Sequence, residues 1–173
     1  MKLILGDITK METDAIVTPA STDLTETEGI SKAIFDAVDR NALKKALKKI
    51  GHCPIGHAVI TPSFGLKASY IIHSAGPGWY SGRANDRNVF RDCYQNAIYK
   101  AYSYGCRSVS IPLMFSGTLH IPRTEALKLV EEVVDRMERS LPSIEIYLVV
   151  YKKSIFDTAT RVLKHAEIVD DIK

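Results

Sequence analysis

Two loops rich in small and polar residues are the places where this chain could bind a ligand. One is TPASTDLTETEGI, residues 18–30, and the other is LMFSGTLHI, residues 113–121. Each precedes a stretch with helical periodicity. The first backbone N–H groups of a helix have no intrahelical acceptor and lie at the positive end of the helix dipole, so they favour anions. The pattern predicts phosphate-type sites, best at Ser116–Thr118, although a tight turn without function fits that triplet equally well.

Histidine and cysteine offer a second kind of chemistry. His73 follows two isoleucines, which favours a core histidine with a satisfied hydrogen bond. His52, Cys53 and His57 are close in sequence but lack the paired spacing of a zinc site, so no metal is predicted. His120, in the second loop, is either a phosphate contact, a general acid or base, or loop filler.

The elements that position these loops follow an α/β pattern, in which short apolar runs alternate with helical stretches. Several runs are apolar throughout, as in strands covered on both faces. Strands are predicted at Lys2–Leu5, Ala15–Val17, His57–Thr61, Tyr70–Ser74, Ser108–Ile111 and Ile144–Tyr151. Both loops follow carboxyl ends of predicted strands, which is the edge where open α/β sheets bind ligands.

The ends of the predicted helices are marked by capping residues. Gly51 and Gly105 each follow a helical stretch, and Pro122 suits a first turn. Ser154 and Asp157 have the spacing of a capping box that opens the last helix. Helices are predicted around Ser31–Val38, at Ala42–Ile50, from about Ala84 to Tyr104, from Pro122 to about Arg139, and from Ser154 onward.

The bulk composition narrows the class of protein. The chain has 173 residues, 46% hydrophobic and 25% charged, as expected for one globular domain over residues 1–173. A net charge of +3 is too small to predict a nucleic-acid binder. The three cysteines fit no disulfide framework, so we expect reduced thiols and a cytoplasmic location. The sequence indicates no signal peptide, membrane span or cofactor.

Three groups of motifs, taken in order, resemble one known family. Gly6–Thr9 and Asp14–Val17 are similar to GDIT and DAIVNAAN, Gly56–Thr61 and Tyr70–Trp79 to GxAxxT and YVIHTVGPxW, and Ser108–Pro122 to SIAFPAISTGIYGYP. These are motifs of macro domains, and the chain is closest to the MacroD-like branch. The resemblance implies a three-layer α/β/α domain with a mixed, mostly parallel sheet of about six strands. It also implies binding of ADP-ribose, and in that branch removal of mono-ADP-ribose from proteins and deacetylation of O-acetyl-ADP-ribose.

The same resemblance implies roles for individual residues. Asp7 would accept a hydrogen bond from the adenine amino group with the Ile8 backbone beside it, and Tyr151 would pack on adenine. The diphosphate and distal ribose would be contacted by Gly29, Ile30 and Ser31, by Ser116, Gly117, Thr118 and Leu119, and by Ser21. Simpler interpretations stay open: Asp7 as a turn stabiliser, Tyr151 as a core residue, and Ser21 and Ser31 as caps.

Several positions depart from the family pattern on its catalytic side. Ser21 replaces an asparagine, and the glycine-rich GGGGV reads Glu26–Ile30, with carboxylates at Glu26 and Glu28. Ser31 replaces an acidic residue and cannot act as a carboxylate base. In the second loop, Leu119 replaces an aromatic residue and His120 a glycine. Ser31 and His120 therefore remain the candidates for a catalytic role, which the sequence leaves unassigned.

The sequence favours a domain that binds ADP-ribose or an ADP-ribose derivative, either free or attached to a protein. The first alternative is an ADP-ribosyl hydrolase or O-acetyl-ADP-ribose deacetylase with a non-standard catalytic loop. The second is a binder of RNA or another nucleotide, or an interaction module with a disabled pocket. A basic helical face, made by Lys44, Lys45, Lys48 and Lys49, supports the RNA-binding alternative. Simple exposure of these lysines to solvent explains the pattern as well.

Overall fold

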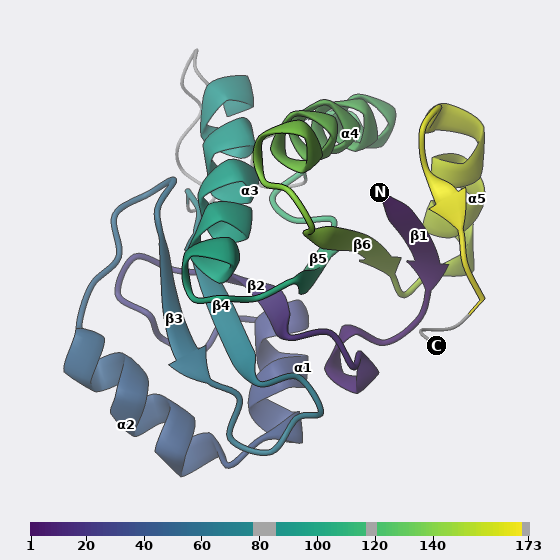
Figure 1. Ribbon diagram of the computed structural model, residues 1–173. Helices are drawn as coiled ribbons and strands as arrows, with labels where there is room; N and C mark the ends of the chain where they lie inside the picture. Colours follow the sequence, from purple (N-terminus) through teal and green to yellow (C-terminus); the bar gives the residue numbers. More distant parts are fainter. Residues whose placement is uncertain (78–85, 117–120, 171–173) are drawn as a thin grey trace.

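A computed structural model describes residues 1–77, 86–116 and 121–170, and shows three layers (Figure 1). Helices α3, α4 and α5 cover one face of a central sheet, and α1 and α2 cover the other. In chain order the elements are β1 (Lys2–Leu5), the short 3₁₀ helix η1 (Ile8–Lys10), β2 (Ala15–Ala20), α1 (Ile30–Ala37), α2 (Arg40–Ile50), β3 (Ala58–Pro62), β4 (Tyr70–Ala75), α3 (Asp86–Ser103), β5 (Ser108–Pro112), α4 (Arg123–Ser140), β6 (Glu145–Val150), α5 (Lys153–Val162) and β7 (Glu167–Ile168).

The sheet has the order β3-β4-β2-β5-β6-β1-β7, and among the described strands only β3 runs antiparallel to its neighbour. The mixed, mostly parallel α/β class predicted from sequence is confirmed. The sheet has seven strands and not six, because the two exposed residues of β7 pair with β1 at the edge. A two-residue exposed strand leaves no apolar run for a sequence pattern to reveal.

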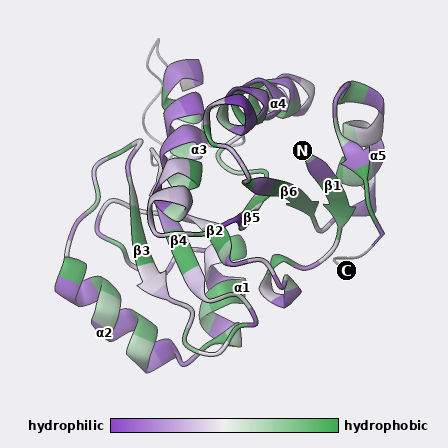
Figure 2. Cartoon of the chain, viewed as in Figure 1, coloured by the Kyte–Doolittle hydropathy of each residue, from purple (hydrophilic) through white to green (hydrophobic). Residues whose placement is uncertain are grey.

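Alternate residues of β1, β2, β4 and β6 pack into two separate cores. On β6, Ile146, Leu148 and Val150 pack beneath α3, α4 and α5, whereas Tyr147 and Val149 pack on the side of α1 and α2. This follows from the period of two along a strand, and it explains why the sequence of β6 is continuously apolar after Glu145. Figure 2 shows the complementary pattern in α2, where hydrophobic and hydrophilic residues alternate along a helix with one buried face.

Most predicted boundaries agree with the structure within one or two residues, and the last helix is the main correction. α5 begins at Lys153 with Lys152 as its N-cap, so Ser154 lies inside the first turn and the predicted capping box does not form. Asp157 instead forms an i,i+4 ion pair with Lys153, and the Ser154 carbonyl accepts a hydrogen bond from Thr158 Oγ1.

Two predicted helix ends take the backbone conformation that glycine permits. Gly51 has φ 85° as the C-cap of α2, and Gly105, just beyond α3, has φ 88°. α4 starts at Arg123, directly after Pro122. Among the described residues, none of the helices has both the length and the hydrophobicity of a membrane span.

Candidate functional site

The carboxyl ends of five parallel strands meet at one edge of the sheet. β1, β2, β4, β5 and β6 all point toward this edge, which we call the carboxyl edge. The backbone continues pairing just past the strand ends: Gly6 N donates to Val150 O at 3.0 Å, and Gly76 N donates to Ala20 O at 3.0 Å. The backbone that leaves β1 and β4 is therefore held by hydrogen bonds one residue beyond the end of each strand.

Residues 1–77, 86–116 and 121–170 form at least two pockets along the carboxyl edge. The first, which we call the β6 pocket, has a volume of about 540 Å³ and is lined by Gly6, Asp7, Ile8, Gly29, Ile30, Ala33, Pro112, Leu113, Val149, Val150, Tyr151, Lys152 and Ile155. The second, the β4 pocket, has a volume of about 720 Å³ and is lined by Pro19, Ala20, Ser21, Thr22, Asp23, Thr27, Glu28, Gly29, Ile55, Gly76, Pro77, Leu113, Phe115 and Ser116. Gly29 and Leu113 line both pockets, so the two adjoin at these residues, and we call the two together the cleft.

Asp7 has one carboxylate oxygen engaged and one available to the β6 pocket. Its Oδ1 accepts hydrogen bonds from Thr9 N at 2.9 Å and from Thr9 Oγ1 at 2.7 Å, which caps η1. No described residue donates to Oδ2. The turn-stabilising role and a ligand-facing role are therefore compatible, because an ionised carboxylate accepts through both oxygens.

Tyr151 and Ile8 flank the same pocket in different ways. The side chain of Tyr151 is 78% exposed, so the interpretation of Tyr151 as a core residue is wrong. It follows the buried end of β6 and lines the β6 pocket with a free aromatic face. Ile8 is buried, and its position in η1 places its backbone beside Asp7.

Gly29 stands where the two pockets meet and where α1 begins. It is the N-cap of α1 with φ 76° and ψ −125°, a backbone conformation that residues other than glycine rarely adopt. Its carbonyl accepts from Ala33 N at 3.0 Å, and no side chain caps the helix. The first-turn amides, beginning with Ile30 N, therefore have no i−4 acceptor and lie at the cleft.

Ser31 does not line either pocket. Its side chain is buried, and its Oγ accepts a hydrogen bond from Thr27 N at 3.1 Å. It holds the preceding loop closed, as the cap interpretation of Ser31 describes.

The two glutamates of the first loop have different surroundings. Glu26 forms an ion pair with Arg40 of α2, and the Nζ of Lys44 lies 3.9 Å from the same oxygen. Glu28 is exposed and lines the β4 pocket. The negative charge of Glu26 is thus neutralised away from the cleft, so of these two glutamates Glu28 is the one that adds negative charge to the cleft wall.

Ser21 and Asp23 form a small hydrogen-bonded turn in the β4 pocket. Ser21 Oγ donates to Asp23 Oδ1 at 2.6 Å, and Thr25 Oγ1 donates to the same oxygen at 2.9 Å. These hydrogen bonds, the one from Ser21 first, lower the pKa of Asp23 because they favour its ionised form. The carboxylate of Asp23 is therefore ionised near neutral pH.

Phe115 forms an aromatic wall of the β4 pocket that the sequence did not predict. Its ring occupies the space where a side chain at position 76 would begin: a Cβ built on Gly76 would lie 2.2 Å from Phe115 Cε1. Phe115 itself has φ 59°, which is uncommon for a residue with a side chain. A positive φ at a phenylalanine leaves no signal in the sequence, and the family motif that contains Gly76 does not indicate this contact.

Ser116 lines the β4 pocket, as the loop prediction requires. The rest of the predicted second loop, Gly117, Thr118, Leu119 and His120, lies outside the described residues. The roles predicted for these four residues stay predictions.

His73 is a core residue, as predicted. It is buried on β4, and its Nε2 lies 2.9 Å from Thr61 Oγ1 on β3. Burial lowers the pKa of His73 to about 3, so the ring is neutral under ordinary conditions. Within residues 1–77, 86–116 and 121–170, no three His, Cys, Asp or Glu side chains gather into a group that could hold a metal ion.

Comparisons with known proteins agree with this architecture. The family model described as "Macro domain" matches residues 17–130. A macro domain-containing protein of Lactiplantibacillus plantarum is 39% identical over 129 residues, covering 75% of this chain and 74% of that protein. A protein of Citrobacter koseri named O-acetyl-ADP-ribose deacetylase is 35% identical over 150 residues, covering 84% of this chain and 85% of that protein.

A solved structure extends the likeness to three dimensions. The Oceanobacillus iheyensis macrodomain with ADP superposes with a TM-score of 0.85 at 26% identity, covering 94% of this chain and 90% of that one. A mutant of the same macrodomain with ADPR gives a TM-score of 0.85 at 25% identity, covering 94% of this chain and 91% of that one. With its seven-stranded α/β/α fold, its cleft at the carboxyl edge and these matches, the chain belongs to the macro domain family.

Proposed function

We propose that this protein binds ADP-ribose or an ADP-ribose derivative, free or attached to a protein, in the cleft along the carboxyl edge. The observation that carries the proposal is the pair of pockets joined at Gly29 and Leu113. Volumes of about 540 and 720 Å³ each fall within the range of roughly 300–1,000 Å³ typical of ligand pockets. A ligand with two bulky ends and an anionic middle suits this shape.

The adenine belongs in the β6 pocket. Asp7 Oδ2 is available to accept a hydrogen bond from the adenine amino group, with the Ile8 backbone beside it. The exposed ring of Tyr151 is available to stack on the base. The surrounding surface is mostly apolar, as a base that stacks requires.

The diphosphate belongs at the junction of the pockets, and the distal ribose in the β4 pocket. The first-turn amides of α1, beginning at Ile30, provide donors and the positive end of a helix dipole beside Gly29. Ser116 contributes from the opposite wall, and Ser21 is placed for the distal ribose hydroxyls. For Ser31 the proposal assigns only its backbone amide in the first turn of α1, because its side chain is buried outside both pockets and its Oγ accepts a hydrogen bond from Thr27 N.

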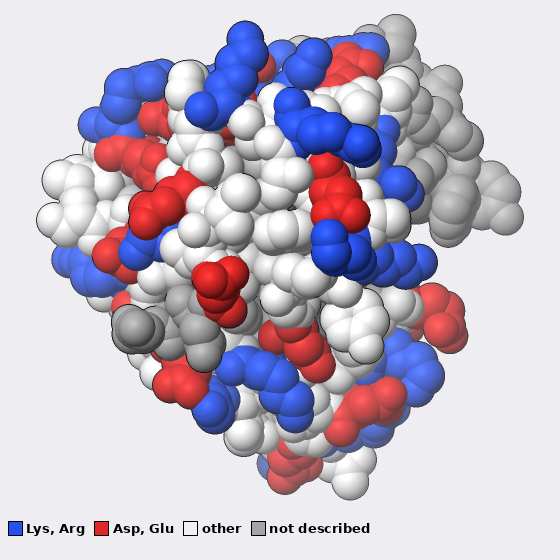
Figure 3. Space-filling view, turned by 90° about the vertical axis from the view of Figure 1, so that its right-hand side faces the viewer, with Lys and Arg blue, Asp and Glu red and all other residues white. Residues whose placement is uncertain are grey.

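We further propose that residues 1–173 form a single domain of this kind and that it acts in the cytoplasm. Free, buried thiols at Cys53, Cys93 and Cys106 support a reducing compartment. ADP-ribosylated proteins are the partners that this site would recognise. We do not propose a nucleic-acid partner: on the face that carries α5, Figure 3 shows Lys and Arg interspersed with Asp and Glu.

Isothermal titration with ADP-ribose, with AMP as the reference ligand, tests the proposal. AMP fills the β6 pocket alone, whereas ADP-ribose spans both pockets. We expect micromolar binding of ADP-ribose, about −8 kcal/mol, and weaker binding of AMP. No binding of ADP-ribose, or binding no tighter than that of AMP, would refute the proposal.

Hydrolysis of O-acetyl-ADP-ribose is a second candidate function, favoured by the name of the Citrobacter koseri relative and by two carboxylates, Asp23 and Glu28, in the β4 pocket. Either carboxylate is placed to act as the general base, whereas the hydroxyl group of Ser31 is buried away from the pocket. Acetate release measured for the wild type, Asp23→Asn and Glu28→Gln tests this. If the wild type releases acetate and one of these substitutions abolishes the release, the protein is an enzyme. If the wild type releases no acetate, the protein is a binding domain.

A further inference from the structure

The hydroxyl group of Tyr94 bridges the two residues on either side of Leu113. Tyr94 lies on α3, is fully buried, and packs against Phe90 with ring centroids 5.0 Å apart. Its hydroxyl donates to Pro112 O at 2.8 Å and accepts from Met114 N at 2.5 Å. One side-chain oxygen thus satisfies a backbone acceptor and a backbone donor that are separated by a single residue.

These two hydrogen bonds act where β5 has just ended. Pro112 is the last residue of β5, and Met114 is 1% exposed, so no solvent can replace the tyrosine at that amide. Leu113, between them, lines both the β6 pocket and the β4 pocket. The orientation of the backbone at Leu113 therefore decides how the two halves of the cleft meet.

The same helix also anchors the opposite wall of the β4 pocket. Cys93 Sγ donates to Ala75 O at 3.6 Å, and Ser74 Oγ donates to Cys93 O at 2.9 Å, at the end of β4. Gly76 follows directly, with the ring of Phe115 against it. Neighbouring residues of α3 thus hold both the loop after β4 and the loop after β5, which fixes their separation.

Burial keeps Tyr94 in the protonated form that this bridge needs. Desolvation raises the pKa of Tyr94 above its usual range, so the hydroxyl keeps its proton at neutral pH and can donate it to Pro112 O. The hydroxyl rotor has a single arrangement that satisfies both partners, donating to the carbonyl and accepting from the amide.

We propose that Tyr94 is a positioning residue for ligands that span both pockets: its hydroxyl fixes Leu113 and the start of the second loop without touching the ligand. The inference rests on the proposed function, because it concerns the affinity of a two-pocket ligand. It predicts that loss of the hydroxyl weakens a ligand that fills both pockets and spares one that fills the β6 pocket alone.

The test is the variant Tyr94→Phe, which keeps the ring in the core, titrated with ADP-ribose and with AMP. Tyr147→Phe is the matched control, because Tyr147 is 5% exposed and its hydroxyl bonds to Glu145 and Lys2, which are not cleft residues. For Tyr94→Phe we expect ADP-ribose affinity to fall about tenfold, or about 1.4 kcal/mol, and AMP affinity to change less than about twofold. Tyr147→Phe should leave both affinities unchanged.

Equal losses for both ligands would mean general loosening of the fold, and unchanged ADP-ribose affinity would mean that the hydroxyl is dispensable; either result overturns the proposal. Hydrogen exchange at the Met114 amide gives a readout without ligand. The Met114 amide should be protected from exchange in the wild type and should exchange faster in Tyr94→Phe. Rapid exchange in the wild type would overturn the proposal even if the variant does not fold. A wild type that binds neither ligand would refute the proposed function, and the exchange result would still decide the role of Tyr94.

Discussion

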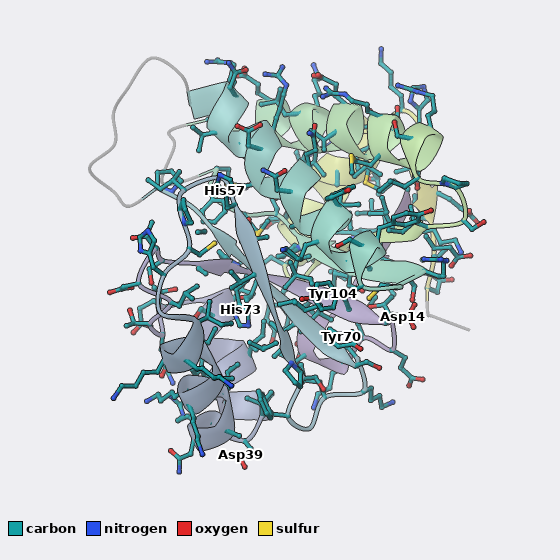
Figure 4. All side chains as sticks on the ribbon, turned by 60° about the vertical axis from the view of Figure 1, so that its left-hand side comes forward. Asp14, Asp39, His57, Tyr70, His73 and Tyr104 are labelled. Atoms are coloured by element: carbon teal, nitrogen blue, oxygen red, sulfur yellow. The ribbon has the colours of Figure 1, made fainter. Side chains whose placement is uncertain are left out.

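The two edges of the sheet differ in where their polar groups find partners. At the amino edge, where the parallel strands begin, protein groups satisfy one another. Asp14 Oδ2 accepts from Arg107 N at 2.7 Å and from Ser108 N at 3.0 Å, and Asp14 O accepts from Ser69 N and Tyr70 N. The rings of Tyr70 and Tyr104 pack edge to face beside Asp14 (Figure 4).

At the carboxyl edge, polar groups are positioned but left open. Asp7 uses one oxygen to cap η1 and leaves the other without a donor among the described residues. The first turn of α1 has no side-chain cap, and the exposed ring of Tyr151 lines a pocket. Partners for these groups must come from solvent or from a ligand.

The comparison separates stability from binding. Substitutions at the amino edge remove protein–protein hydrogen bonds and should lower the free energy of unfolding without changing ligand affinity. Substitutions at the carboxyl edge should lower ligand affinity, whether or not they also lower the free energy of unfolding. Pairs of similar substitutions at the two edges, or at a cleft position and a position remote from it, therefore test this account.

The largest effect on affinity is expected at Gly29. Gly29→Ala forces a side chain into a conformation with φ 76°, a strain of about 1–3 kcal/mol, and relief of that strain moves the first-turn amides of α1. We expect about 100-fold weaker ADP-ribose binding, roughly 2.7 kcal/mol, by isothermal titration. Gly51→Ala, with φ 85° at the far end of α2, carries a comparable strain away from the cleft and should keep wild-type affinity. Equal affinity losses in both variants would break the comparison.

Asp7 should show the next largest effect. In Asp7→Asn the side-chain oxygen can still accept from Thr9, but an NH₂ donor replaces Oδ2 in the pocket. An unpaired donor costs about 1–3 kcal/mol, so both AMP and ADP-ribose should bind about tenfold or more weakly while thermal stability is kept. Asp14→Ala, at the amino edge, should lower the free energy of unfolding by about 1 kcal/mol for each lost hydrogen bond and leave affinity intact. If Asp7→Asn binds AMP normally, adenine is not held there.

A smaller and more selective effect is expected at Gly76. A Cβ at this position would overlap the ring of Phe115, which must then swing into the β4 pocket. Gly76→Ala should weaken ADP-ribose roughly fivefold, about 1 kcal/mol, and leave AMP unaffected. Adding Phe115→Ala removes the overlap and should restore part of the lost stability. Thermal melts and titrations of the single and double variants measure this coupling, and additive effects would contradict the contact.

The prediction with the smallest effect on affinity concerns His73, which lies between the two edges. Lowering the pH should reduce the stability of the protein strongly through this residue. Its pKa is about 3 in the folded protein and 6.5 in the reference state, so below pH 6.5 the unfolded chain binds a proton that the folded chain excludes. Stability contributed by the neutral ring is full above pH 6.5 and falls as pH drops toward 3. Between pH 6.5 and 5 the loss should be about 2 kcal/mol at about 1.36 kcal/mol per unit.

Urea denaturation at several pH values measures this dependence. His73→Gln should flatten the slope, whereas His57→Gln, at an exposed position, should not. A wild-type stability that is constant from pH 7 to pH 5 would contradict a neutral, buried His73.

The fold was predictable because its signals are local. The apolar runs of β2 and β6 indicate strands covered on both faces, and Gly51 and Gly105 mark helix ends by a conformation that other residues avoid. β7 was missed because two exposed residues carry no pattern. The start of α5 was misplaced because the Ser154–Asp157 spacing resembles a capping box, while the Lys153–Asp157 ion pair places both residues inside the helix.

The site was only partly predictable because its walls are assembled across the chain. Asp7, Gly29 and Tyr151 were singled out by resemblance to family motifs, and all three line the cleft. Tyr94 reads as one of a helical series of apolar residues, and the partners of its hydroxyl lie 18 and 20 residues away. Likewise, no spacing rule relates Phe115 to Gly76, since their contact depends on a positive φ.

The most direct test of the central claim is a titration of the isotope-labelled protein with ADP-ribose, followed by the amide resonances of both edges. The account predicts saturable shifts at Ile8, Ile30 and Leu113 on the carboxyl edge, and unchanged resonances at Ser108 and Tyr70 on the amino edge. AMP should reproduce the shift at Ile8 and leave Ser21 and Ser116 unmoved. Shifts confined to the amino edge, or no saturable shift at the carboxyl edge, would contradict the assignment of the cleft as the ADP-ribose site.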